Sequence, residues 1–95
     1  MERTTKRQLD FAVERLNAAT GNALEPYTFN EAAGRHLANV GNYHIDHAYG
    51  GFQLCQMCNE GGGIRTIQPY RGTKGEAWAC ITAILEVINA YGEVR

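Results

Sequence analysis

The sequence lacks a long apolar run. None of its 95 residues belongs to a stretch of about 18 consecutive apolar residues, the minimum for a membrane-spanning helix. The N-terminal segment MERTTKRQLD is charged and has no apolar stretch like that of a signal peptide. We therefore expect a soluble protein that does not associate with a membrane.

The sequence also has few cysteines and almost no net charge. Three cysteines are an odd number, which is a poor basis for a disulfide framework and favours a cytosolic protein with reduced thiols. Nine basic residues against ten acidic residues give a formal net charge of −1. That near balance argues against general nucleic-acid binding and equally against mimicry of a polyanion such as DNA.

The length is that of one compact domain, which we place at residues 1–95. A chain of this size buries about 60–65% of the surface that it exposes when unfolded, so its core is modest. A deep active-site cleft would use up much of that core. A surface site is therefore the easier option, and pairing into a homodimer is a reasonable default.

Two segments, residues 5–20 and 74–91, have apolar residues at helical spacing. In the first segment these are Leu9, Ala12, Val13, Leu16 and Ala19, and in the second they are Ala77, Trp78, Ile81, Ile84, Leu85 and Ile88. Thr5 with Gln8 at the start of the first helix fits a capping box, and Thr73 with Glu76 fits one at the start of the second. The glycines placed to end the two helices are Gly21 and Gly92.

Between the helices the sequence predicts a connecting loop and then a strand. The loop covers residues 27–34, and HLANVGNYHIDHAY, residues 36–49, forms the strand. Leu37, Tyr43 and Ile45 share one parity and should face the core. Val40 breaks that parity beside Gly41, which indicates a bulge or bend.

Glycines mark the next two chain reversals. Gly50-Gly51 predicts a hairpin turn that leads into a return strand, residues 52–59. Gly61-Gly62-Gly63 predicts another reversal, followed by an irregular third strand over residues 64–70. The predicted fold class is α+β, with a three-stranded antiparallel meander, both helices on one face, and the order α-β-β-β-α.

The stretch before the second helix is rich in glycine and basic residues. A helix start attracts anions, and arginine, lysine and glycine there would let a phosphate or a partner approach the backbone. Ordinary turn and capping chemistry explains the same residues, since the capping pair already satisfies two amide groups. The residues of this predicted ligand or partner site are Gly61, Gly62, Gly63, Arg65, Tyr70, Arg71, Thr73 and Lys74.

A second cluster of reactive residue types is HIDH…CQMC, with His44, Asp46, His47, Cys55 and Cys58. Written linearly it is like a zinc site, and a cysteine beside a histidine is a candidate nucleophile. Residues three apart in a strand point to opposite faces, however, and buried thiols are inert. We therefore predict no metal ligands, no cofactor and no catalytic residues, and we expect Cys80 to be packing. Tyrosines at strand ends, together with Trp78, suit an interface.

Several phrases of the sequence resemble a group of short phage and prophage proteins that have not been characterised. The matching residues are Arg15-Leu16-Asn17, Thr20-Gly21, Glu25-Pro26-Tyr27, residues 38–44, residues 48–51 and residues 59–62. The resemblance implies a phage accessory protein in the cytoplasm of an infected host cell, where such proteins commonly block host defences by binding.

We therefore expect a non-enzymatic protein that binds and inhibits a host defence component. One alternative is a sponge that sequesters a phosphorylated, nucleotide-like signal at the basic start of the second helix. The other alternative is a small thiol or zinc enzyme that uses the His44/His47 and Cys55/Cys58 hairpin.

Overall fold

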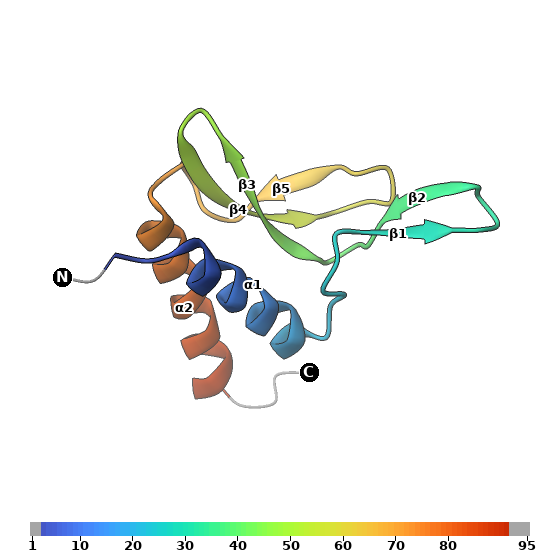
Figure 1. Ribbon diagram of the computed structural model, residues 1–95. Coiled ribbons are helices and arrows are strands. Elements are labelled where there is room, and N and C mark those ends of the chain that lie inside the picture. Colours follow the sequence, from blue (N-terminus) through green and yellow to red (C-terminus); the bar gives the residue numbers. More distant parts are fainter. Residues whose placement is uncertain (1–2, 92–95) are drawn as a thin grey trace.

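The computed structural model describes residues 3–91, which form two helices and five strands (Figure 1). The elements are α1 (Lys6–Thr20), β1 (Tyr27–Asn30), β2 (Arg35–Ala38), β3 (Tyr43–Ala48), β4 (Gly51–Met57), β5 (Ile64–Thr66) and α2 (Lys74–Ala90). Strands β3, β4 and β5 form an antiparallel meander, and both helices cover one face of it. The predicted α+β fold class and its three-stranded meander are confirmed. Within the described residues no helix has the length and apolar character needed to cross a membrane.

The segment predicted to be a loop, residues 27–34, is instead part of a second sheet. Strands β1 and β2 pair antiparallel as a hairpin that projects from the end of the meander (Figure 1). The single strand predicted over residues 36–49 is therefore two strands, β2 and β3, separated by a turn at Gly41, whose φ is 96°. Leu37 lies half-buried in the hairpin and not in the core.

Both predicted capping boxes are present. The Thr5 hydroxyl accepts from the Gln8 amide at 3.1 Å, and the Gln8 side chain accepts from the Thr5 amide at 2.9 Å. Gly21 ends α1 with a φ of 75°, in the left-handed conformation that glycine adopts without strain. Gly92, predicted to end α2, lies outside the described residues.

The core lies between the two helices and one face of β3 and β4. Its buried members are Leu9, Ala12, Leu16, Leu54, Ala77, Ile81 and Leu85, and the half-buried residues around it include Val13, Tyr43, Ile45, Phe52, Cys80, Ile84 and Ile88. The predictions for Ala19 and Trp78 were wrong: Ala19 is exposed and Trp78 is 41% exposed. Trp78 follows Ala77, and one residue turns a helix by about 100°, so the ring lies at the flank of the buried stripe.

A buried asparagine joins α1 to the meander. Asn17 is fully buried, its side-chain amide donates to the Tyr43 carbonyl at 3.0 Å, and its side-chain oxygen accepts from the Tyr43 amide at 2.7 Å. The side chain thus pairs with the first residue of β3 as a neighbouring strand would. This contact fixes where β3 begins against the helix layer.

The β3–β4 turn lies one residue earlier than predicted. Tyr49 and Gly50 form the two-residue loop, with φ of 54° and 74°, and Gly51 already pairs with Ala48 as the first residue of β4. Positive φ at both loop residues is the pattern of a type I′ turn. Gly51 has another role: a Cβ there would be 3.0 Å from the Cβ of Arg71, so glycine lets the chain before α2 pass close by.

Candidate functional site

The residues predicted to form one basic corner lie at two ends of β4. Gly72, beside Arg71, forms a bridge with Phe52 near the start of β4. Arg65 on β5 is paired with Gln56 near its end. Phe52 and Gln56 are four positions apart along the strand, which is roughly 13 Å.

The two arginines also lie on opposite faces of the meander. Arg65 donates from Nε and Nη2 to the Gln56 side-chain oxygen at 2.9 and 2.7 Å. Arg71 donates to the Asp46 carbonyl at 3.1 Å and forms an ion pair with the Asp46 carboxylate. Asp46 is paired with Gln53, so these two side chains share a face of the meander. Gln53 and Gln56 are three residues apart on β4, so their side chains lie on opposite faces. Arg65 and Arg71 therefore do not form one positive patch.

The glycine triplet, residues 61–63, packs closely against two side chains of the protein, those of Asn59 and Tyr27. The Gly63 amide donates to the Asn59 side chain at 2.9 Å, and a Cβ on Gly63 would collide with that side chain. Gly62 has a φ of 95°, and a Cβ there would be 3.0 Å from the Tyr27 hydroxyl. The loop needs these glycines for its own packing.

The start of α2 is occupied by a carboxylate of the chain. The Thr73 amide donates to Glu76 Oε1 at 2.7 Å, and the Glu76 amide donates to the Thr73 hydroxyl at 3.0 Å. A Cβ on Gly72 would collide with the Glu76 carboxylate, so glycine there makes room for the cap. A phosphate approaching this helix end would meet a negative charge, which disfavours the phosphate version of the predicted site.

An open hollow of about 450 Å³ lies beside the same helix end. Thr73 and Lys74 of the predicted site line it, together with residues that were not predicted: Arg3, Thr4, Gly50, Phe52 and Gly75. The ammonium group of Lys74 lies 5.6 Å from the centre of the Phe52 ring. Tyr70, also predicted, does not line this hollow and is exposed. No sequence signal showed that the segment before α1 would lie beside the start of α2, because that contact is long-range.

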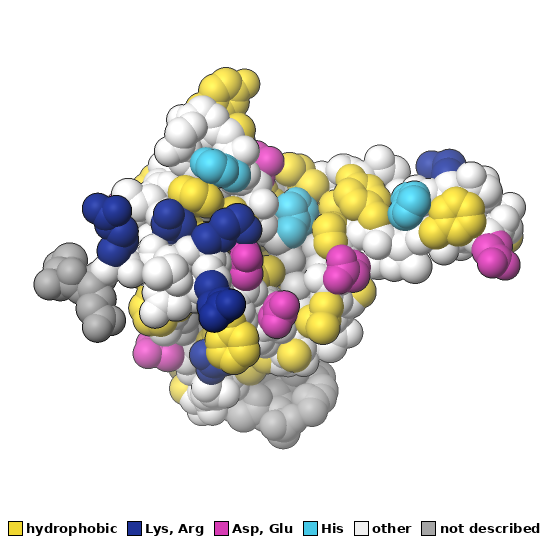
Figure 2. Space-filling view, in the orientation of Figure 1, with side chains coloured by type: hydrophobic (Ala, Val, Ile, Leu, Met, Phe, Trp, Pro, Cys, Tyr) yellow, Lys and Arg dark blue, Asp and Glu magenta, His cyan; other side chains and the backbone are white. Residues whose placement is uncertain are grey.

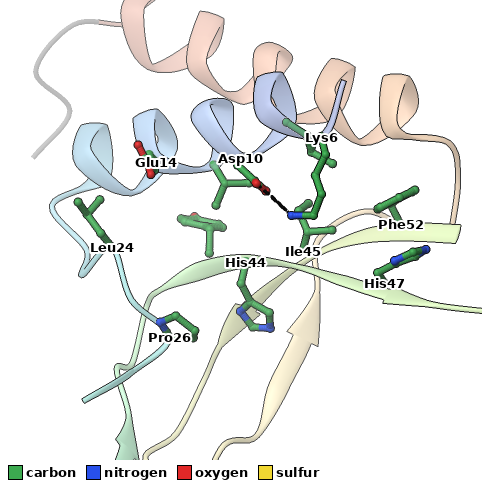
Figure 3. A pocket seen from close by; sticks show the side chains of 12 residues that line it. Lys6, Asp10, Glu14, Leu24, Pro26, His44, Ile45, His47 and Phe52 are labelled. Carbon is green, nitrogen blue, oxygen red and sulfur yellow. Dashed lines mark hydrogen bonds and ion pairs between the residues drawn. The ribbon is translucent and has the colours of Figure 1, made fainter. Parts of the chain in front are cut away.

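The histidines of the HIDH phrase point to opposite faces, as strand geometry requires. In Figure 3 the His44 imidazole lies on the side of β3 away from α1. His47 lies on the helix side and stacks on Phe52, with ring centres 4.1 Å apart. Among residues 3–91, no three His, Cys, Asp or Glu side chains converge as a metal site needs.

Cys55 is opposite His44 in the β3–β4 register, but the pair is not activated. Burial, and secondarily the nearby Asp46 carboxylate, raises the pKa of the Cys55 thiol, although Arg71 opposes this. Burial lowers the pKa of His44 despite the Asn42 backbone and Asp46. Both shifts favour the neutral forms, whereas a nucleophilic pair needs a thiolate beside an imidazolium. Cys58 is exposed, at the end of β4.

A groove of about 260 Å³ runs between α1 and β3 (Figure 3). Its sides include Leu9, Val13 and Ile45, and Lys6 and Asp10 form an ion pair of 3.0 Å over it. The volume is below the 300–1,000 Å³ or so that small-molecule sites occupy. The groove therefore suits one or two apolar side chains better than a cofactor.

The β1–β2 hairpin carries apolar side chains into solvent. Every residue of β1 is exposed, including Tyr27 and Phe29, and Phe29 makes an edge contact with His36 at 5.3 Å on the same hairpin. Figure 2 shows hydrophobic and histidine side chains on the visible face of this projection. No residue of β1 belongs to the core cluster.

Comparisons of the chain with protein-family models, with curated proteins and with solved structures give no match. Function is therefore inferred from the surfaces of this chain.

Proposed function

We propose that this protein acts by binding another protein, without catalysis, and that the β1–β2 hairpin is its main docking element. The proposed setting is the cytoplasm of an infected cell, where the partner is a host defence component that the protein inhibits. That setting rests on the resemblance to short phage proteins described above.

The exposed hairpin is the observation that carries the proposal. An isolated two-stranded hairpin is at best marginally stable in water, because neither of its faces is covered. Here its base is held by Asn39, whose side chain donates to the Glu25 carbonyl and to the Thr28 hydroxyl at 2.8 Å each. The Ala38 amide also donates to the Glu60 carbonyl at 3.1 Å. Among residues 3–91, the outer part of the hairpin has no comparable hydrogen bond to the rest of the protein, and a partner surface would supply such support.

The side chains on the hairpin suit a protein partner. Tyrosine and other aromatic residues dominate the energetics of protein interfaces because they bury a large area at a low entropic cost. Phe29 lies near the middle of the projection and is 52% exposed. Its ring is the best candidate for an anchor.

The absence of catalysis is proposed on chemical grounds. The most reactive pairing that the sequence offers is Cys55 with His44, and the environment raises the pKa of that thiol. The α1–β3 groove is small, and its charged side chains Lys6 and Asp10 are paired with each other. Neither feature supplies a poised acid, base or nucleophile.

The test is affinity capture from lysate of the infected host, with tagged wild type and two variants. Phe29→Ser removes the proposed anchor, and Val87→Ser is the matched control because Val87 is 57% exposed on α2. Wild type and Val87→Ser should capture the same host protein, and Phe29→Ser should lose it while keeping the wild-type circular dichroism spectrum. Equal capture by all three proteins would reject the hairpin as the docking element. Sedimentation as a dimer that Phe29→Ser dissociates would show that the hairpin joins two copies instead.

A further inference from the structure

The first turns of the two helices lie side by side at the end of the molecule away from the hairpin (Figure 1). A Cβ on Gly75 in α2 would be 3.4 Å from the hydroxyl of Thr4, just before α1. Four cations belong to these two first turns or to the residue stretch just before α1, and we call them the basic pole: Arg3, Lys6, Arg7 and Lys74. They are half of the eight Lys and Arg side chains in residues 3–91. Figure 2 shows Lys and Arg side chains gathered on this side of the molecule.

Helix stability does not explain these charges. Lys6 and Arg7 are the first two residues of α1, Lys74 is the first of α2, and α1 has no acidic residue in its first turn. Cations at a helix start oppose the helix dipole, so each is unfavourable there for folding. An anionic partner would reverse the sign of that effect.

Most of the basic pole is not neutralised by the described part of the chain. Lys6 forms an ion pair with Asp10 at 3.0 Å. Arg3, Arg7 and Lys74 have no carboxylate of residues 3–91 within ion-pair distance. The hollow of about 450 Å³ lies between Arg3 and Lys74 with the Phe52 ring in its wall. Trp78 lines an adjoining hollow with Arg3. The surface thus combines unpaired cations, aromatic rings and open space.

We propose that the basic pole binds an acidic segment of a partner protein. In this arrangement carboxylates of the segment lie against Arg3, Arg7 and Lys74, and an apolar side chain of the segment enters the hollow over Phe52. Aromatic residues mixed with arginine are the composition of a protein interface. The basic pole and the hairpin are at opposite ends of the molecule, so this site is independent of the proposed hairpin docking.

The charges that lie between the cations favour an acidic protein segment over a nucleic acid. Two carboxylates lie near these cations: Asp10 pairs with Lys6 one turn further along α1, and Glu76 lies in the first turn of α2. A nucleic-acid backbone has a negative charge at every nucleotide and cannot avoid these carboxylates. A protein segment has separate carboxylates that can be spaced to meet only the cations. A single phosphate is also disfavoured, because Glu76 already occupies the start of α2.

The experiment measures fluorescence anisotropy with three labelled probes of equal length. The first is a peptide in which Asp and Glu alternate with Leu, the second replaces the acids by Asn and Gln, and the third is an oligothymidylate. The double variant Arg3→Glu/Lys74→Glu is compared with Arg15→Glu/Arg65→Glu, which changes the net charge equally at two exposed cations outside both the basic pole and the hairpin.

We expect the acidic peptide to bind wild type and the neutral peptide to fail. The pole variant should weaken binding of the acidic peptide about tenfold or more, and the control variant less than about twofold, at physiological salt. Equal weakening in both variants would mean that only net charge matters, and would overturn the proposal. Tighter binding of the oligothymidylate than of the acidic peptide would overturn it in favour of a nucleic-acid surface. Failure of the acidic peptide to bind wild type would overturn it as well.

Discussion

Replacing Asn17 by alanine tests how the helix layer holds the meander. The Asn17 side chain is fully buried and makes two hydrogen bonds, of 3.0 and 2.7 Å, to the carbonyl and amide of Tyr43. Asn17→Ala removes both and leaves two backbone groups of β3 without a partner in the interior. Leaving a buried polar group unpaired costs about 1–3 kcal/mol, and because both hydrogen bonds are only part-buried we expect about 1–2 kcal/mol for each, a total of about 2–4 kcal/mol.

A loss of that size is large for a domain of this length. Small domains are stable by about 5–15 kcal/mol, and 1 kcal/mol shifts the melting temperature by roughly 4–8 °C. Asn17→Ala should therefore melt about 8–30 °C below wild type when followed by circular dichroism. Urea denaturation should give the corresponding decrease in the free energy of unfolding.

Two further variants separate the hydrogen bonds from other effects of the substitution. Asn17→Asp keeps the shape but loses the donor to the Tyr43 carbonyl, so it should be destabilised as well, whereas a simple cavity effect would leave it near wild type. Glu14→Ala changes an exposed residue of the same helix and should stay within about 0.5 kcal/mol of wild type. An Asn17→Ala protein with the stability of Glu14→Ala would refute the structural role of this contact.

Two more predictions follow from the glycine loop and from His44. Gly62→Ala forces a Cβ onto a residue with a φ of 95° and against the Tyr27 hydroxyl, and should lower the free energy of unfolding by about 1–2 kcal/mol. Gly61→Ala, where φ is not positive, should lower it less in the same urea titration, and equal effects would contradict the packing role of Gly62. Burial lowers the pKa of His44 below its ordinary value of 6.5, so its contribution to stability is present above that value and is lost as pH falls through the folded-state pKa. Urea titrations at about pH 8 and pH 5.5 should show that the free energy of unfolding decreases less between these pH values for His44→Gln than for wild type. The control His36→Gln, at an exposed histidine, should show the same decrease as wild type.

The elements with local signals could be predicted from the sequence. Each capping box depends on two residues three apart, and each helix has an apolar stripe that repeats within one turn. The meander also followed from local features, since glycines mark both of its reversals. Its first turn was placed one residue late because Gly51 is glycine for a long-range reason, the close passage of Arg71.

Alternating hydrophobicity was only a short, weak signal for the hairpin. A strand shows that pattern when one face is buried and the other is in water. Tyr27 to Asn30 alternates aromatic and polar residues, but the run is only four residues long, and both faces of β1 are exposed, so the alternation does not mark a buried face. The remaining signal was the turn chemistry: the Asn30 side chain accepts from the Ala33 amide at 2.8 Å, and Gly34 has a φ of 68°. Polar turn residues with glycine are frequent in ordinary loops, and the segment was interpreted as one.

The candidate site was the least predictable part because it depends on strand register. Arg65 and Arg71 are six residues apart in the sequence, but β5 pairs with the far end of β4 and Gly72 with its start. That register places the two guanidinium groups on opposite faces. No local pattern around either arginine contains this information.

The glycines in the loops around the meander are packed against other parts of the protein, which favours binding at the ends of the molecule. Four glycines in these loops each lie against a side chain of the protein itself: Gly51, Gly62, Gly63 and Gly72. The space beside them is therefore occupied by the protein and is not open to a ligand. The apolar hairpin at one end and the basic pole at the other are the two surfaces that we propose for partners. A hydrophobic partner surface and an acidic segment could therefore be bound at the same time without competing, because the meander and the helices lie between the two surfaces.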